Sequence, residues 1–244
     1  MKTLASEWFA PITESPGFLN VPIARAADVL LEWRRELYGT VSAREVHGGF
    51  PDMLAHLEPL NILRNRELLV PVAPDWTAYF DCSPGGTDSA SAIGVLTLRA
   101  HATGFFIHCL PHITGPRRGQ IRRMGSVTFS MLAPFPTGRM NYVRTIQAVY
   151  SGSRWEFFLI GTEQPFEEVD RYGARKVRDR FTPDMLERYC QALGVDVFNL
   201  QAYGDSGILI ESKVVTPNPI ETWTLAQVQS MRGIVPGEAD ELAG

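Results

Sequence analysis

Apolar side chains recur at helical spacing in several stretches of the chain. Between Asn20 and Gly39 they lie three or four positions apart with charged residues between them; the apolar positions are Ile23, Ala26, Ala27, Leu30, Trp33 and Leu37. This spacing predicts an amphipathic helix that is capped by Asn20 and ended by Gly39. The same pattern predicts helices over 89–100 and 182–193, and a capping box at Thr224 predicts a short last helix.

Other runs are rich in β-branched and aromatic residues. Residues 68–73 and 76–80 flank a tight-turn pair and predict a hairpin, in which Pro71 pushes the first strand toward a sheet edge. The run FFIHCL (105–110) is apolar on both faces, as a central strand would be. The remaining predicted strands cover 126–132, 141–150, 154–160 and about 208–215, and a polar strand or loop is expected at 40–49.

Helices and strands alternate without a steady βαβ rhythm, which favours an α+β fold. We expect a single domain over residues 1–244, with a mixed, mostly antiparallel sheet packed by about four to five helices. Residues 1–20 carry Trp8, Phe9 and Phe18 among prolines and are expected to form an irregular N-terminal arm. Residues 236–244 are expected to be a frayed acidic tail.

Composition narrows the class of protein. The chain has 244 residues, of which 45% are hydrophobic and 20% charged, and a formal net charge of −4. Its three cysteines, Cys82, Cys109 and Cys190, indicate a reducing compartment rather than a disulfide framework. A run of about 18 apolar residues and a signal-peptide core are both missing, so we expect a cytoplasmic protein that makes no membrane contact. The acidic balance disfavours nucleic acid as a partner.

The turn DCSPGGTD, from Asp81 to Asp88, is the first candidate site. Its glycines could offer backbone N–H groups to an anion beside a helix start, although Asp81 and Asp88 would repel a phosphate and suit Ca²⁺ only with further oxygen ligands. The simpler interpretation, a strand-to-helix turn with Asp88 as the cap, is favoured.

The histidines and cysteines offer weaker candidates. His108 and His112, with Cys109 or His101, could ligate zinc, but their spacing matches no established metal motif, and Cys109 points away from His108 on a strand. Cys82 or Cys109 beside a histidine could serve acyl transfer, but no nucleophile motif surrounds either residue. We therefore predict no metal, no cofactor and no catalytic residue.

Two basic clusters are candidate binding surfaces. The first is a loop with four arginines, Arg117, Arg118, Arg122 and Arg123; the second lies before the 182–193 helix and contains Arg171, Arg175, Lys176, Arg178 and Arg180. Clustered arginines bind carboxylates and phosphates, but nearby acids would ordinarily neutralise them; for the second cluster these are Glu163, Glu167, Glu168, Asp170 and Asp179.

The runs WTAYFD (76–81) and GTD (86–88), followed by RDRFT (178–182) before an amphipathic helix, resemble a family of uncharacterised bacterial proteins from toxin–immunity neighbourhoods. The resemblance covers most of the chain after about residue 60. It transfers no catalytic residue, and it implies a binding role.

Two functions from different classes follow. The preferred one is a non-enzymatic, cytoplasmic binding protein, for example an immunity protein that neutralises a bacterial toxin by covering it. The alternative is a small-molecule or anion-binding enzyme that uses the Asp81–Asp88 turn and the strand end at His108. The oligomeric state is left open.

Overall fold

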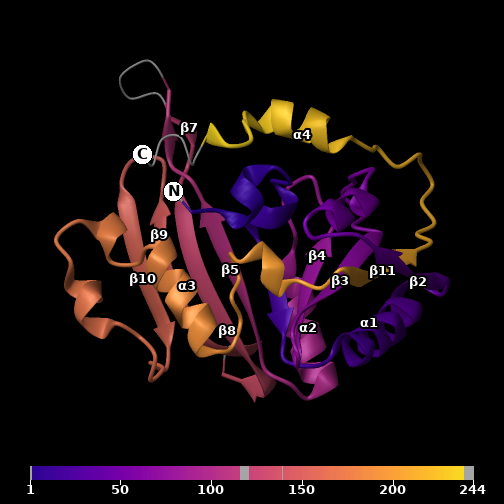
Figure 1. Cartoon of the computed structure of the whole chain (residues 1–244), viewed down its shortest axis with the longest axis horizontal. Helices are drawn as coiled ribbons and strands as arrows, with labels where there is room; N and C mark the ends of the chain where they lie inside the picture. The colour runs from indigo at the N-terminus through magenta and orange to yellow at the C-terminus, as the bar shows by residue number, and fades with distance from the viewer. Residues whose placement is uncertain (1, 116–120, 139, 239–244) are drawn as a thin grey trace.

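The computed structural model describes residues 2–115, 121–138 and 140–238 (Figure 1). Its main feature is a nine-stranded sheet in which every pairing is antiparallel, in the order β10-β9-β8-β5-β1-β4-β3-β11-β2. The strands are β1 Gly17–Leu19, β2 Val41–His47, β3 Arg66–Ala73, β4 Trp76–Asp81, β5 Gly104–Leu110, β8 Ser126–Thr137, β9 Met140–Tyr150, β10 Trp155–Gly161 and β11 Ser206–Ser212. A separate ribbon pairs β6 Ile113–Thr114 with β7 Ile121–Arg123.

Helical elements cover both faces of the sheet. The four α-helices of the described residues are α1 Ile23–Tyr38, α2 Ser89–Ala100, α3 Pro183–Ala192 and α4 Leu225–Arg232. The 3-10 turns are η1 Leu4–Glu7, η2 Ile12–Glu14, η3 Asp52–Leu57, η4 Val169–Gly173, η5 Val177–Asp179 and η6 Leu200–Ala202. The content is therefore mixed, as expected for an α+β chain, but the sheet dominates. No described helix is long and apolar enough to cross a membrane.

Two apolar cores lie on opposite sides of the sheet. One face, which we call the α1/α2 face, buries Leu30, Ile93 and Phe106 beneath these helices. The other, the α3 face, buries Phe105, Phe129 and the ring of Tyr189 beneath α3, α4 and the N-terminal turns. The alternation of Phe105 and Phe106 between the two cores is the period of two expected of a strand covered on both sides. The prediction that FFIHCL forms an interior strand is confirmed, because β5 lies between β8 and β1.

Local sequence signals placed most elements correctly. Gly39 ends α1 with a positive φ of 74°, and Asp88 caps α2 by accepting a hydrogen bond from Ser91 N. The capping box at Thr224 is present. The hairpins of β3 with β4 and of β9 with β10 both form.

Three expectations were wrong. Residues 17–19 are not part of a surface arm: they form β1, in the interior of the sheet, and Phe18 is fully buried against the ring of Phe105. Pro71 does not mark a sheet edge, because β3 lies between β4 and β11. The pairing of β3 with β11 ends at Leu69, and the Pro71 carbonyl accepts from Gly204 N beyond that point, so the missing N–H of Pro71 interrupts no ladder bond. Asn20 does not cap α1: Pro22 stands at the cap, and the Asn20 amide donates to the carbonyl of Asp75.

Candidate functional site

The Asp81–Asp88 turn is held by its own carboxylates. Asp81 ends β4 and is fully buried, and it accepts hydrogen bonds from the backbone N–H groups of Ser83 at 2.8 Å and Asp88 at 2.9 Å. Asp88 caps α2 and forms an ion pair with Arg64. Burial raises the pKa of Asp81 from its ordinary 3.8 to about 7, against the lowering effect of the Ser83 bond. These contacts are those of a strand-to-helix turn with Asp88 as the helix cap, which is the interpretation favoured from the sequence.

A second buried carboxylate, missed from the sequence, lies beside this turn. Glu67 in β3 accepts bonds from Arg34 Nε at 2.7 Å and Nη2 at 2.6 Å, and from the Tyr79 hydroxyl at 2.7 Å. The Arg34 guanidinium stacks on the Trp33 ring. The sequence signal that could have revealed this group is a charged residue inside an apolar strand, since such residues are buried only when paired.

The partners of Glu67 and the two aspartates of the turn line a small cavity of about 120 Å³. It is lined by Trp33, Arg34, Tyr38, Leu63, Arg64, Tyr79, Asp81, Asp88, Ser91 and Ala92. Pockets for organic ligands usually measure about 300 Å³ or more. This cavity therefore suits water or a small ion better than a substrate.

The histidines do not converge. His108 shares a hydrogen bond of 2.6 Å with the Ser15 hydroxyl, whereas His112 packs on Tyr150 and Trp155. His101 takes the left-handed conformation that ends α2. Burial lowers the pKa of His108, and burial together with Arg178 lowers that of His112, so both rings favour the neutral form. Within the described ranges no cluster of His, Cys, Asp and Glu side chains could hold a metal ion.

The pair of Ser15 and His108 has the chemistry of a nucleophile and a base, but not the setting. Ser15 is buried, which keeps a substrate carbonyl from reaching its hydroxyl. No described carboxylate hydrogen-bonds to His108. All three cysteines are buried free thiols, and burial raises the pKa of Cys82 to about 11 and of Cys109 to about 12, which leaves little thiolate for attack.

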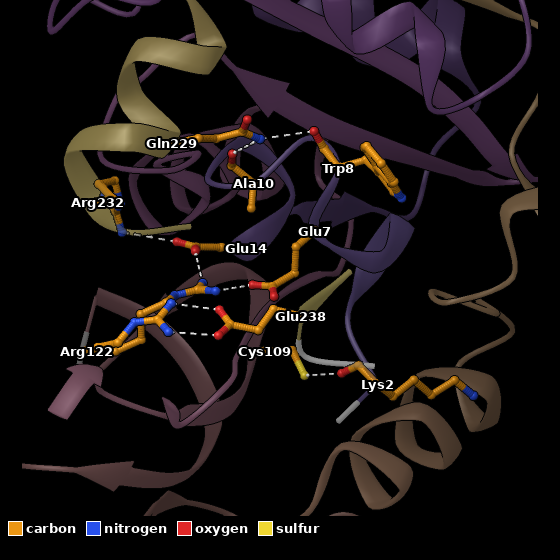
Figure 2. A network of polar contacts seen from close by, with 11 residues as sticks. Lys2, Glu7, Trp8, Ala10, Glu14, Cys109, Arg122, Gln229, Arg232 and Glu238 are labelled. Carbon is orange, nitrogen blue, oxygen red and sulfur yellow. Dashed lines mark hydrogen bonds and ion pairs between the residues drawn. The ribbon is translucent and has the colours of Figure 1, made fainter. Parts of the chain in front are cut away.

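The two described arginines of the first basic cluster form ion pairs with residues near both ends of the chain (Figure 2). Arg117 and Arg118 lie outside the described residues. Arg122 forms a bidentate ion pair with Glu238, with both distances 2.8 Å. Arg123 is buried between the carboxylates of Glu7 and Glu14, and Glu14 also contacts Arg232 in α4 at 3.1 Å.

We call Glu7, Glu14, Arg123 and Arg232 the terminal clasp. Two carboxylates and two guanidinium groups balance each other there, and Gln229 of α4 adds bonds of 3.0 Å to the carbonyls of Trp8 and Ala10. Burial raises the pKa of Glu14, while Arg232 and Arg123 oppose that rise. Arg123 is therefore buried within the fold and is not free to bind an acidic partner, whereas Arg122 is paired with Glu238 at the surface.

The second basic cluster has the opposite character, because two of the acids expected to neutralise it are bound elsewhere. The side chain of Glu167 is fully buried in a bidentate pair with Arg144, and Glu168 forms a bidentate pair with Arg188 of α3. Asp179 makes only a 3.7 Å contact with Arg178. Arg175 and Lys176 are exposed and form no ion pair with any residue that the structure describes.

This cluster lies against β10. The Arg180 guanidinium stands 5.9 Å above the Phe157 ring, and Tyr172 contacts the same ring. Residues 154–158, at the start of β10, line a hollow of about 420 Å³ together with Val177 and Arg180. Because Phe157 points to the α3 face, the cluster covers that face of the strand and leaves the opposite face to Glu156, Phe158 and Ile160.

The outer edge of β10 carries free backbone groups. In the pairing of β9 with β10, Glu156 lies opposite Val149. Just beyond the two ends of this pairing, Ser151 N donates to Arg154 O and Thr162 N donates to Val143 O. Because hydrogen-bonded and non-hydrogen-bonded pairs alternate along an antiparallel ladder, these two bonds show which residues of β10 bond to β9. Residues 156, 158 and 160 therefore bond inward to β9. The N–H and C=O groups of Trp155, Phe157 and Leu159 point outward, and they bond to no residue that the structure describes.

The side chains at this edge are apolar and exposed. Phe158, Leu159 and Ile160 are 43%, 44% and 38% exposed, respectively, in three consecutive positions. The other edge strand, β2, carries Arg44, Glu45 and His47 instead. Charged side chains on an edge strand are the usual protection against pairing with another chain. The sheet therefore has one protected edge and one open edge.

Comparisons with protein-family models, curated proteins and solved structures gave no match.

Proposed function

We propose that this chain is a non-enzymatic, cytoplasmic binding protein whose partner protein adds a strand to the open edge of β10. An immunity protein that covers a toxin would be a protein of this kind. The observation that carries the proposal is the run of three exposed apolar side chains on an unpaired edge strand. An added strand would satisfy the outward backbone groups of residues 155, 157 and 159 and cover those side chains.

The alternative, an enzyme at the Asp81–Asp88 turn and His108, has less support. The carboxylate of Asp81 is taken up by two backbone N–H groups, and His108 bonds to Ser15. The cavity at the turn measures about 120 Å³, which leaves no room for an organic substrate. By contrast, the β10 edge offers both directional hydrogen-bonding groups and apolar surface.

The test compares a proline at each edge of the sheet. Leu159→Pro removes an outward N–H from β10 and no bond to β9. The matched control is Ala43→Pro in β2, the strand at the other edge of the sheet. Gly48 N donates to Asp205 O and Lys213 N donates to Thr40 O at the two ends of the β2–β11 pairing, and the alternation between them leaves the Ala43 N–H pointing outward. We expect affinity purification from the native host to recover a partner with the wild type and the Ala43 variant but not with the Leu159 variant.

Hydrogen exchange then locates the contact. The amides of Trp155, Phe157 and Leu159 should exchange rapidly in the free protein and become protected in the complex. Protection confined to another surface, or equal recovery of the partner by both proline variants, would refute strand addition at β10.

A further inference from the structure

The chemistry around β10 also indicates which kind of segment it would take. This step depends on the proposed function. A strand added to β10 would extend both rows of side chains, because alternate residues of a strand point to opposite faces of a sheet. One row would continue Phe158 and Ile160. The other would lie beside Leu159 and Phe157, next to the second basic cluster.

The two faces differ in polarity. On the α3 face, Arg180 lies over Phe157. Once Glu167 and Glu168 are paired with Arg144 and Arg188, the five basic residues of the second cluster are left with three acids, Glu163, Asp170 and Asp179, so two positive charges remain uncompensated. The positive charge of Arg178 helps to lower the pKa of His112, and the His112 ring contacts Trp155 at the start of β10. Arg178 therefore lies on the same side of the molecule as the start of β10. On the α1/α2 face, Phe158 and Ile160 are exposed and apolar.

We infer that the partner presents an extended segment in which acidic residues alternate with apolar ones. The acidic side chains lie against the second basic cluster, and the apolar side chains cover Phe158 and Ile160. A second copy of this chain fits less well, because it would bring a like-charged cluster to the same face of the extended sheet. Nucleic acid would leave the apolar row and the outward backbone groups without partners.

The probes are labelled peptides of about eight residues, the length of an ordinary strand. The first alternates valine with glutamate, and the second alternates valine with lysine. The third has the composition of the first but arranges the residues in pairs, which destroys the period of two. Fluorescence anisotropy should show that the valine–glutamate peptide binds at least about tenfold more tightly than the other two. Raising the salt from about 0.05 M to about 0.5 M should weaken it.

Variants of the protein test the two surfaces separately. The double variant Arg175→Glu/Lys176→Glu changes two exposed, unpaired side chains and should weaken the acidic peptide about tenfold. The matched control is Arg25→Glu/Arg35→Glu, which reverses two exposed arginines on α1 and should leave affinity unchanged. Leu159→Pro should abolish binding of the acidic peptide.

The outcomes separate this inference from the proposed function. If the glutamate and lysine peptides bind with equal affinity and the Leu159→Pro variant binds neither, the inference of an acidic partner is wrong, but strand addition is still supported. An acidic preference that survives Leu159→Pro would overturn strand addition, and binding of none of the peptides would overturn both. Tighter binding of single-stranded DNA than of the acidic peptide, or a dimer dissolved by Leu159→Pro in sedimentation, would assign the edge to a different occupant.

Discussion

Replacing Asp81 by asparagine should change how stability depends on pH. The carboxyl group is fully buried, and its pKa rises from 3.8 to about 7 in the folded chain, chiefly because burial penalises the charged form. Between these values the folded protein holds a proton that the unfolded chain has released. The contribution of Asp81 to the free energy of unfolding is therefore largest below about pH 4 and falls as the pH rises to about 7. Asparagine does not titrate, so the variant lacks this fall.

The magnitude follows from the size of the shift. Each pH unit inside the window costs about 1.4 kcal/mol, and the whole window costs about 4 kcal/mol. Asparagine also carries a penalty that does not depend on pH. Its single carbonyl must serve the two N–H groups that Asp81 accepts from, and this costs about 1 kcal/mol. The variant should accordingly be slightly less stable than the wild type at acid pH and more stable above neutrality.

Urea unfolding at several pH values between about 4 and about 8 measures the difference. Other titrating groups, including Glu14 and His108, are common to both proteins and cancel in the comparison. Asp205→Asn, at an exposed position, is the control and should follow the wild type throughout. Parallel curves for the wild type and the Asp81 variant would show that the buried carboxyl is not protonated in the folded state, and would refute the reasoning.

Three further predictions concern stability. Arg123→Met leaves the buried carboxylates of Glu7 and Glu14 without their shared partner. The free energy of unfolding should fall by about 3–5 kcal/mol at neutral pH and by less in acid, which urea unfolding at both pH values would measure. Gly17→Ala would place a Cβ 2.4 Å from Ile93 Cγ1 and should lower stability by about 1–3 kcal/mol in thermal melts. Leu159→Pro should be more stable than Phe158→Pro by about 1–3 kcal/mol in the same melts, because only the second breaks a bond to β9; equal losses would contradict the edge assignment.

Elements specified by local chemistry were predictable from the sequence. The spacing of apolar residues and a glycine stop identify α1, and the Asp88 cap and Thr224 capping box identify the starts of α2 and α4. The short strand β1 was missed because three residues show no periodicity. Its position in the sheet depends on pairing with β4 and β5, whose residues are far along the chain.

The candidate sites were harder to predict, because ion pairing is decided by the fold. Arg123 and Glu7 are 116 positions apart, so the sequence could not show that this arginine is buried and neutralised. The reverse error affects the second basic cluster. Glu167 and Glu168 stand close to it in sequence, but the fold directs them to Arg144 and Arg188. Proximity along the chain therefore predicted neutralisation where the structure shows uncompensated charge.

The contrast between the two sheet edges is the strongest argument for a partner. A free edge strand can pair with any other strand, and chains that must stay apart protect such edges with charge. This chain does so at β2, where the side chains include Arg44 and Glu45, but not at β10, where Phe158, Leu159 and Ile160 are exposed. If the β10 edge served only to end the sheet, the same protection would be expected there. The uncompensated cations beside it add selectivity, because they attract an acidic segment and repel a basic one. An edge that combines open hydrogen-bonding groups, exposed apolar side chains and a neighbouring surplus of positive charge has the three properties needed to recognise one kind of strand.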